Sequence, residues 1–244
     1  KKIDSNKQHI MCGIVGIFNV NSQPVSISML KRMRDSIKHR GPDGDGIWSN
    51  SFIGFGHRRL AIIDLSPLAN QPMQTDDGNY VITYNGEVYN FMNLRIELES
   101  LGFKFHSKSD TEVILKAFQH WGKDCILKFN GMFSFAIWDN RKNELFVARD
   151  RYGIKPLYYY YKNGTFIFAS EIKAILEHND VSVSVCNEAL NEYFSFQNVF
   201  SDLTIFENIK ILPAANTLTL RLGDVNSLKL YEYWDYDFKD HDTM

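Results

Sequence analysis

Hydrophobic positions along the chain follow strand-like spacing in some segments and helix-like spacing in others, and they predict the order of the elements. An apolar run at 12–18 is rich in Ile and Val and ends at an Asn, which is typical of a buried strand. The stretch 79–90 alternates, and we expect this strand to end in a turn at Asn85-Gly86. Further strand-like segments lie at 54–65, 132–138, 144–149, 157–161, 165–169 and 228–238.

Apolar residues at helical spacing separate these strands. The segment 26–39 places Leu30, Met33 and Ile37 on one face, and Ser109 with Glu112 forms a capping-box pattern before another apolar-faced segment. The remaining helices are predicted at 90–102, 109–122, 169–178 and 187–196, and a mobile loop is predicted at 40–46. The order of sheet, helices, sheet and helices predicts one mixed α/β unit with largely antiparallel strands.

Composition narrows the class of protein. The chain has 244 residues, of which 44% are hydrophobic and 23% charged, as expected for a globular protein with a sizeable core. Its net charge of −2 argues against a nucleic-acid partner. No apolar run approaches the roughly 20 residues that a membrane helix needs, and the first ten residues lack the apolar region of a signal peptide. We therefore expect a cytoplasmic protein that contacts no membrane.

The three cysteines, Cys12, Cys125 and Cys186, are odd in number and widely spaced. This pattern favours a reducing compartment and predicts neither a disulfide framework nor a metal site. Cys12 directly follows Met11, so loss of Met11 places a thiol and a free α-amine on one residue, a nucleophile and a base. In the printed chain, residues 1–10 precede this pair and the α-amine lies in a peptide bond. An inert, buried thiol is the alternative that we keep for the other two cysteines.

Nine short stretches in register resemble class II glutamine amidotransferases, in the branch of the bacterial glutamine-hydrolysing asparagine synthetases. They are MCGIVGIF, HRGPDGDG, GHRRLAIIDLS, QPM, YNGEVYN, SDTEVIL, FNGMFSFAIWD, ARDRYGIKPLYY and ASEIKAI. The resemblance runs from Met11 to about Phe238. It implies the α+β fold of N-terminal-nucleophile hydrolases, a four-layer αββα sandwich of two mostly antiparallel sheets with helices outside. It also implies hydrolysis of L-glutamine to glutamate and ammonia.

The resemblance assigns three residues to catalysis. Cys12 matches the nucleophile that forms a γ-glutamyl thioester, with its own α-amine as the general base. Asn85 and the backbone N–H of Gly86 match the donors to the oxyanion. Taken alone, the dipeptide predicts only a hairpin turn, so this assignment depends on the resemblance.

Five further residues match substrate-binding positions. Arg59 matches the residue that binds the α-carboxylate of glutamine, a role that suits a guanidinium group. Glu87 and Asp110 match the groups that hold the α-ammonium. Ile62 and Ile63 match positions that contact glutamine through backbone atoms.

The resemblance also divides the chain. Residues 1–11 correspond to a leader, tag or extension, 12–235 to a type-2 glutamine amidotransferase domain, and 236–244 to the start of a linker. No cofactor is implied for this domain, whereas ATP and Mg²⁺ are implied for a synthetase domain in the same or another chain. The expected partners are therefore L-glutamine and that ATP-dependent domain, and a homodimer stays open.

Two other functions remain open at this stage. One is a non-catalytic docking or regulatory domain of the same fold that keeps its N-terminal extension. The other is an N-terminal-nucleophile hydrolase acting on a different amide, without a matched site for the α-groups of an amino acid. Outside the site, we expect Asp150 to order a turn against Arg149 or Arg151, and Asp43 to shape its own loop.

Overall fold

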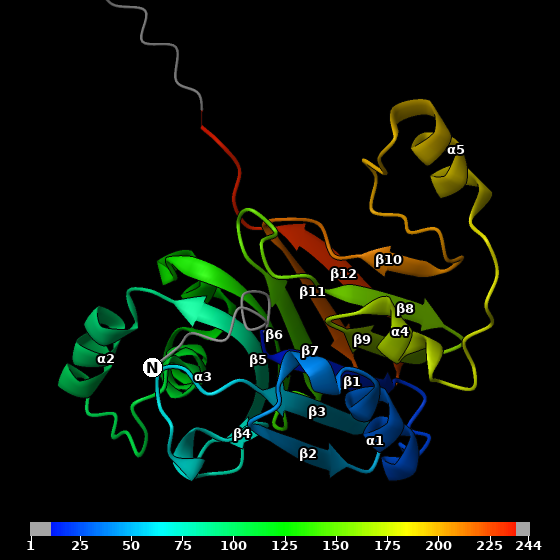
Figure 1. The fold of residues 1–244 in the computed structure, drawn as a ribbon. Helices are drawn as coiled ribbons and strands as arrows, with labels where there is room; N and C mark the ends of the chain where they lie inside the picture. Colours follow the sequence, from blue (N-terminus) through cyan, green and yellow to red (C-terminus); the bar gives the residue numbers. More distant parts are fainter. Residues whose placement is uncertain (1–10, 238–244) are drawn as a thin grey trace, which may run out of the picture.

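Two six-stranded sheets packed face to face form the centre of the molecule (Figure 1). The computed structural model describes residues 11–237. The strand order is β10-β8-β9-β1-β3-β2 in sheet A and β12-β11-β7-β6-β5-β4 in sheet B, and neighbouring strands pair antiparallel. The sheets lie between two layers of helices, so the four-layer αββα fold predicted from the resemblance is confirmed.

The elements have the following bounds. Sheet A contains β1 (Gly13–Asn19), β2 (Gly44–Asn50), β3 (Ile53–Arg59), β8 (Tyr158–Lys162), β9 (Thr165–Ala169) and β10 (Ile209–Ile211). Sheet B contains β4 (Met73–Gln74), β5 (Tyr80–Val88), β6 (Gly131–Asp139), β7 (Glu144–Arg149), β11 (Asn216–Arg221) and β12 (Asp224–Glu232). The α-helices are α1 (Ile27–Ser36), α2 (Phe91–Ser100), α3 (Asp110–Trp121), α4 (Ile172–Leu176) and α5 (Asn187–Phe196). The 3-10 helices are η2 (Lys38–Arg40), η3 (Pro67–Ala69) and η4 (Gly122–Lys128).

Strand β1 shows why its sequence is apolar at nearly every position. Phe18 points between the sheets, where its ring lies 5.2 Å from that of Trp138 in β6. Val15 and Ile17 point to the opposite face and pack under α1. Because both faces of β1 are covered, a continuous hydrophobic run replaces alternation. Each large apolar side chain buried in this way contributes about 1.5–3 kcal/mol to folding.

The helices cover the outer faces of the sheets. Helices α1 and α4 contribute to a hydrophobic cluster on sheet A, and α2 and α3 contribute to another on sheet B. Helix α5 projects away from the sheets, and Ala189 is its one buried residue (Figure 1). The longest described helix has 12 residues, and no helix between residues 11 and 237 is long and apolar enough to cross a membrane.

Several predicted boundaries need correction. The strand predicted at 228–238 runs from Asp224 to Glu232, and the helix predicted at 169–178 is confined to Ile172–Leu176. The strand predicted at 54–65 ends at Arg59, and the following residues leave the sheet to line a pocket. The loop predicted at 40–46 is shorter, because β2 already begins at Gly44. The predicted turn at Asn85-Gly86 is wrong, since both residues lie inside β5 and pair with β6. Gly86 instead allows β5 and β6 to approach closely, because a Cβ at this position would lie 2.3 Å from the carbonyl oxygen of Met132.

Candidate active site

A pocket of about 370 Å³ opens at one end of the sandwich. There the start of β1 lies beside the end of β3, since Gly13 pairs with Arg58, and the middle of β5 and the first turn of α3 complete the walls. The structure brings all the predicted site residues into this one pocket. They are Cys12, Arg59, Ile62, Ile63, Asn85, Gly86, Glu87 and Asp110.

Cys12 lies at the base of β1 with its thiol in the pocket wall. Its Sγ lies 3.3 Å from the backbone nitrogen and 3.5 Å from the carbonyl oxygen of Leu60. Arg40 donates from Nε to the Cys12 carbonyl oxygen at 3.0 Å and so fixes the backbone. Burial raises the pKa of the Cys12 thiol, which is therefore protonated at neutral pH. Both described hydrogen bonds of Sγ are to backbone atoms, so attack by this sulfur needs a base from elsewhere.

The side-chain amide of Asn85 carries a buried hydrogen-bond donor for which residues 11–237 provide no acceptor. The residue is 1% exposed, and its Nδ2 is buried without a partner among residues 11–237. Buried polar groups are normally satisfied, and exceptions concentrate where a ligand or a function supplies the partner. Asn85 is therefore an available donor in the pocket wall.

The backbone of β5 adds a second donor next to it. The N–H of Tyr84 donates to Oε1 of Gln71 at 2.6 Å, and the N–H of Val88 donates to Oδ2 of Asp110 at 3.1 Å. Alternate N–H groups of a strand point to the same edge, so the N–H of Gly86 points there too, between these two bonds. Gly86 lines the pocket together with Asn85.

Asp110 is fixed at the first position of α3. Its Oδ2 accepts a hydrogen bond of 2.6 Å from the hydroxyl of Tyr84 in addition to the bond from Val88. Burial raises the pKa of Asp110, while these bonds and the positive end of the helix dipole favour the charged carboxylate. Burial and the charge of Asp110 raise the pKa of Tyr84, so its hydroxyl remains a donor. Tyr84 is a site residue that the sequence did not indicate.

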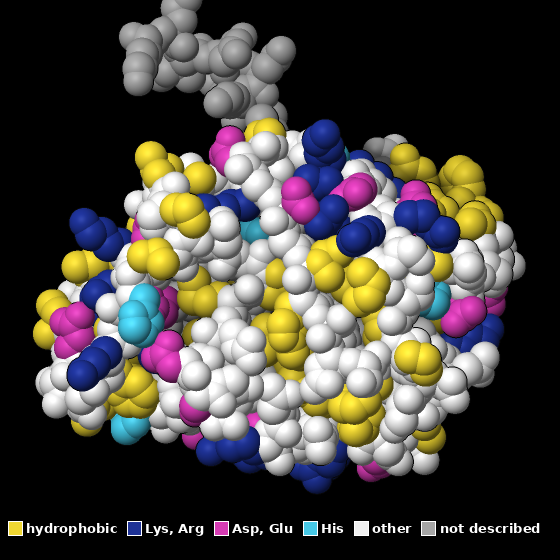
Figure 2. Space-filling model, turned by 90° about the horizontal axis from the view of Figure 1, so that it is seen from below, with side chains coloured by type: hydrophobic (Ala, Val, Ile, Leu, Met, Phe, Trp, Pro, Cys, Tyr) yellow, Lys and Arg dark blue, Asp and Glu magenta, His cyan; other side chains and the backbone are white. Residues whose placement is uncertain are grey.

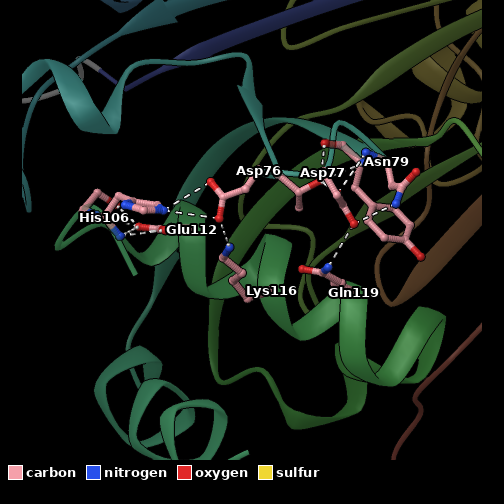
Figure 3. Close-up of polar contacts among 10 residues, drawn as sticks. Asp76, Asp77, Asn79, His106, Glu112, Lys116 and Gln119 are labelled. Atoms are coloured by element: carbon pink, nitrogen blue, oxygen red, sulfur yellow. Dashed lines mark hydrogen bonds and ion pairs between the residues drawn. The ribbon is translucent and has the colours of Figure 1, made fainter. Parts of the chain in front are cut away.

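A polar network holds the start of α3 in place (Figure 3). Ser109 caps the helix by accepting a hydrogen bond from the N–H of Glu112, as the capping-box pattern predicts. The carboxylate of Glu112 does not return this bond but accepts from the N–H groups of His106 and Ser107. Asp76 lies between His106 and Lys116 and joins the turn before β5 to α3. These contacts fix the helix start and with it Asp110.

Arg59 anchors the loop that follows β3. Its guanidinium group donates to Oδ1 of Asn70 at 2.6 Å and to the carbonyl oxygen of Asp64. The hydrogen bond from the N–H of Lys108 lowers the pKa of Asp64 and ties this loop to the segment before α3. Asp43 accepts a hydrogen bond of 2.9 Å from the N–H of Ala61, which agrees with its predicted role in shaping a loop. Sequence reasoning missed Asp64 and Asn70.

Ile62 and Ile63 lie on this same loop, and they are 59% and 39% exposed. Both line the pocket although neither belongs to the hydrophobic core. Glu87 also lines the pocket and is half-buried in β5. Between residues 11 and 237 no group of three or more His, Cys, Asp or Glu side chains is arranged to hold a metal ion.

Lys155 is a further pocket residue that sequence reasoning missed. It follows a turn organised by Asp150, whose fully buried carboxylate accepts from the N–H groups of Phe133, Tyr152, Ile154 and Lys155. The predicted role of Asp150 in ordering a turn is therefore confirmed, but the described hydrogen bonds of its carboxylate come from backbone N–H groups and not from Arg149 or Arg151. The Nζ of Lys155 lies 2.9 Å from Sδ of Met11 and the side chain is 5% exposed.

The face of the molecule shown in Figure 2 carries no such concentration of one kind of side chain. On the face shown in Figure 2, hydrophobic side chains form separate small patches, and positive and negative groups are mixed around them. The pocket residues differ from this face because they combine burial with polar and charged groups.

Comparison with known proteins agrees with this fold and shows the family of the chain. Residues 11–234 match the family described as glutamine amidotransferase domain, and the chain belongs to that family. The chain is 40% identical over 235 residues to asparagine synthetase [glutamine-hydrolyzing] 3 of Bacillus subtilis, and 40% identical over 225 residues to asparagine synthetase [glutamine-hydrolyzing] 1 of the same organism. These matches cover 95% and 91% of this chain but 38% and 35% of the relatives, so it spans well under half of their length.

Solved structures support the fold. The glutamine phosphoribosylpyrophosphate amidotransferase of B. subtilis, in complex with ADP and GMP, matches with a TM-score of 0.67. The match covers 91% of this chain and 49% of that one, at 18% sequence identity. At this identity the similarity establishes a shared architecture.

Proposed function

We propose that this chain is the glutaminase part of a glutamine-dependent amidotransferase. It hydrolyses L-glutamine to glutamate and ammonia, and the ammonia passes to an ATP-dependent synthetase domain that also needs Mg²⁺. The family, the names of the relatives and the pocket support this proposal. The observation that carries it is the meeting of Cys12 with the unpartnered, buried amide of Asn85 in one pocket.

The reaction follows from these positions once Cys12 has a free α-amine. The amine takes the proton of the thiol, and Sγ attacks the carboxamide carbon of glutamine. Asn85 Nδ2 and the N–H of Gly86 donate to the oxygen on which negative charge develops. The protonated amine then passes its proton to the leaving nitrogen, so that ammonia and a thioester result, and water cleaves the thioester to glutamate.

The other end of the pocket recognises the amino acid. Arg59 binds the α-carboxylate, and Asp110 with Glu87 binds the α-ammonium, because these charges are complementary and lie on different walls. The backbone at Ile62 and Ile63 completes the contact. A different amide without both α-groups lacks these charge pairs, which favours glutamine over the other N-terminal-nucleophile reactions.

The test compares two forms of the protein, one whose first residue is Cys12 and one that keeps residues 1–11. We expect the first form to release ammonia from glutamine, and the second to be at least 100-fold slower because its α-nitrogen is an amide. Asparagine serves as the control substrate. Equal inactivity of both forms, with glutamine still bound, would support the docking or regulatory alternative and contradict the proposal.

A further inference from the structure

Lys155 is a buried cation beside the bond between Met11 and Cys12, the bond that the proposed function requires to be absent. The side chain is 5% exposed and lines the pocket beside Met11 and Cys12. In the part of the chain that the structure describes, no carboxylate lies within ion-pair distance of its Nζ, whose recorded hydrogen-bond partner is the thioether of Met11. Burying an ammonium group without a counter-ion costs free energy, and such groups concentrate at functional sites.

The main chain holds Lys155 rigidly. Its N–H donates to Oδ2 of Asp150 at 3.0 Å, and its carbonyl oxygen accepts from Nε of Arg149 at 2.8 Å. Oδ2 of Asp150 also accepts from the N–H of Phe133, the residue that pairs with Gly86. The position of the ammonium group is therefore coupled to the strand that carries the proposed oxyanion donors.

Loss of Met11 changes the surroundings of Lys155 directly. It removes the thioether that Nζ contacts and creates a new α-amine on the next residue, Cys12. We propose, resting on the proposed function, that Lys155 is a positioning residue whose buried ammonium group keeps this α-amine neutral and ready to accept the proton of the thiol.

Other charges around Cys12 oppose or support Lys155. By element they are Arg40 of η2, Arg59 of β3, Asp64 of the following loop, Tyr84 and Glu87 of β5, Asp110 of α3 and Asp150 of the turn before Lys155. Arg40 is ion-paired with Glu171 at 3.1 Å, and the carboxylate of Asp150 is occupied by backbone N–H groups. Asp110 is occupied by Tyr84 and Val88. Lys155 therefore has no carboxylate in contact within residues 11–237, although Glu87 attracts its charge from a distance, and it is the cation whose Nζ contacts Met11 beside the new amine.

The direction of the effect follows from electrostatics. A nearby positive charge disfavours a second one, so the ammonium group of Lys155 lowers the pKa of the α-amine and of the Cys12 thiol. At an effective dielectric constant of about 20, a unit charge about 8 Å away changes the pKa of an amine by roughly 1–1.5. Burial lowers the pKa of Lys155 itself, but an ordinary lysine titrates so far above neutrality that the charge persists at pH 7.

The experiment uses protein whose first residue is Cys12, in the wild type, Lys155→Met and Lys155→Arg. The pH dependence of kcat/KM for glutamine is measured from pH 5.5 to 9.5. For K155M we expect the midpoint of the acidic limb to move up by about one pH unit, which is about a tenfold loss of kcat/KM below the midpoint. At high pH K155M approaches wild type, and K155R keeps the wild-type midpoint because it keeps the charge.

A second readout does not depend on turnover. The ¹⁵N chemical shift of the Cys12 α-amine, followed against pH in selectively labelled protein, gives the pKa of the amine in each variant. A raised pKa in K155M supports the role of Lys155 even in protein that fails to hydrolyse glutamine. An unchanged pKa, or a loss of kcat/KM that is uniform at all pH values, overturns it. Wild type that releases no ammonia contradicts the proposed function but leaves this measurement decisive for Lys155.

Discussion

By their proposed roles the pocket residues form two sets, named the nucleophile end and the recognition end, which differ in how their polar groups are satisfied. At the nucleophile end, defined by Cys12, Asn85, Gly86 and Lys155, the amide of Asn85 has no described partner and Lys155 has no described counter-ion. At the recognition end, defined by Arg59, Glu87 and Asp110, the guanidinium and the carboxylate of Asp110 are already hydrogen-bonded to the protein. The nucleophile end keeps an unpartnered donor and an unpaired cation in place. At the recognition end Arg59 and Asp110 are fixed by hydrogen bonds, whereas Glu87 has no hydrogen-bond or ion-pair partner among residues 11–237.

This difference separates two contributions to catalysis. Donors without partners gain most when negative charge develops on the substrate, so they lower the barrier more than they strengthen ground-state binding. In the proposed reaction the groups at the recognition end contact the α-carboxylate and α-ammonium, which do not react, so these contacts are the same in the ground state and the transition state. We therefore expect changes at the nucleophile end to affect kcat and changes at the recognition end to affect KM.

Replacing Asn85 should have the largest effect. Asn85→Ala removes one oxyanion donor, which typically costs a factor of about 10²–10³ in kcat, with KM within a few-fold of wild type. Steady-state ammonia release measures both constants, and Asn93→Ala, an exposed asparagine on α2, is the matched control. A rise in KM with kcat preserved would remove the distinction between the two ends.

Replacing Asp110 tests the recognition end. Asp110→Asn keeps an acceptor for Tyr84 and Val88 but removes the charge that faces the substrate ammonium. A hydrogen bond to a charged group contributes about 1.5–3 kcal/mol, so KM should rise about 10- to 100-fold with kcat nearly unchanged. If glutamine binding measured by calorimetry is unaffected, the α-ammonium is held elsewhere.

The buried imidazole of His57 contacts the backbone of Tyr84, a residue that lines the pocket. Its Nε2 lies 3.1 Å from the Tyr84 carbonyl oxygen, and burial lowers its pKa from 6.5 to about 3. The folded state thus binds this proton less readily than the unfolded state. The contribution of the neutral His57 to the free energy of unfolding is fully present above pH 6.5. It declines by about 1.4 kcal/mol per pH unit as the pH falls towards 3. Urea unfolding at pH 7.5 and 5.5 should show this decline, and His57→Gln should reduce it; an equal decline in both proteins would contradict the assignment.

Replacing Tyr84 should have the smallest effect. Tyr84→Phe deletes the hydroxyl that donates to Asp110 and leaves the ring in place. A single hydrogen bond is worth about 0.5–1.5 kcal/mol, so KM should rise about 2- to 10-fold. Tyr161→Phe is the control, because the hydroxyl of Tyr161 donates to Val225 away from the pocket. Equal effects of both variants would show that Tyr84 does not act through Asp110.

The local sequence pattern was sufficient to predict the elements that are determined by interactions within a few residues. The run at β1 and the capping signal at α3 identify these elements because burial and capping act over a few residues. The dipeptide Asn85-Gly86 misled because pairing with β6 overrides a local turn preference. Strand β11 was missed although its alternating Leu218 and Leu220 indicate it.

The candidate site divides in the same way. Cys12 stands out in the sequence because it follows Met11, but the roles of Arg59, Glu87 and Asp110 came from resemblance, since no local spacing brings them together. Lys155 and Met11 are 144 residues apart, and their contact depends on the turn that Asp150 builds. Contacts between residues so far apart in the sequence can be identified only once the pairing of the strands is known.

The most direct test of the account is the mass of the protein after reaction with a glutamine analogue that carries an electrophilic ketone. Protein that begins at Cys12 should gain one label, on Cys12 alone, and excess glutamine should protect it. Cys125 and Cys186 are buried and should remain free, and Cys12→Ala should gain no label while still binding glutamine. Labelling of another residue, or no labelling of protein that binds glutamine, would contradict the assignment of Cys12 as the nucleophile.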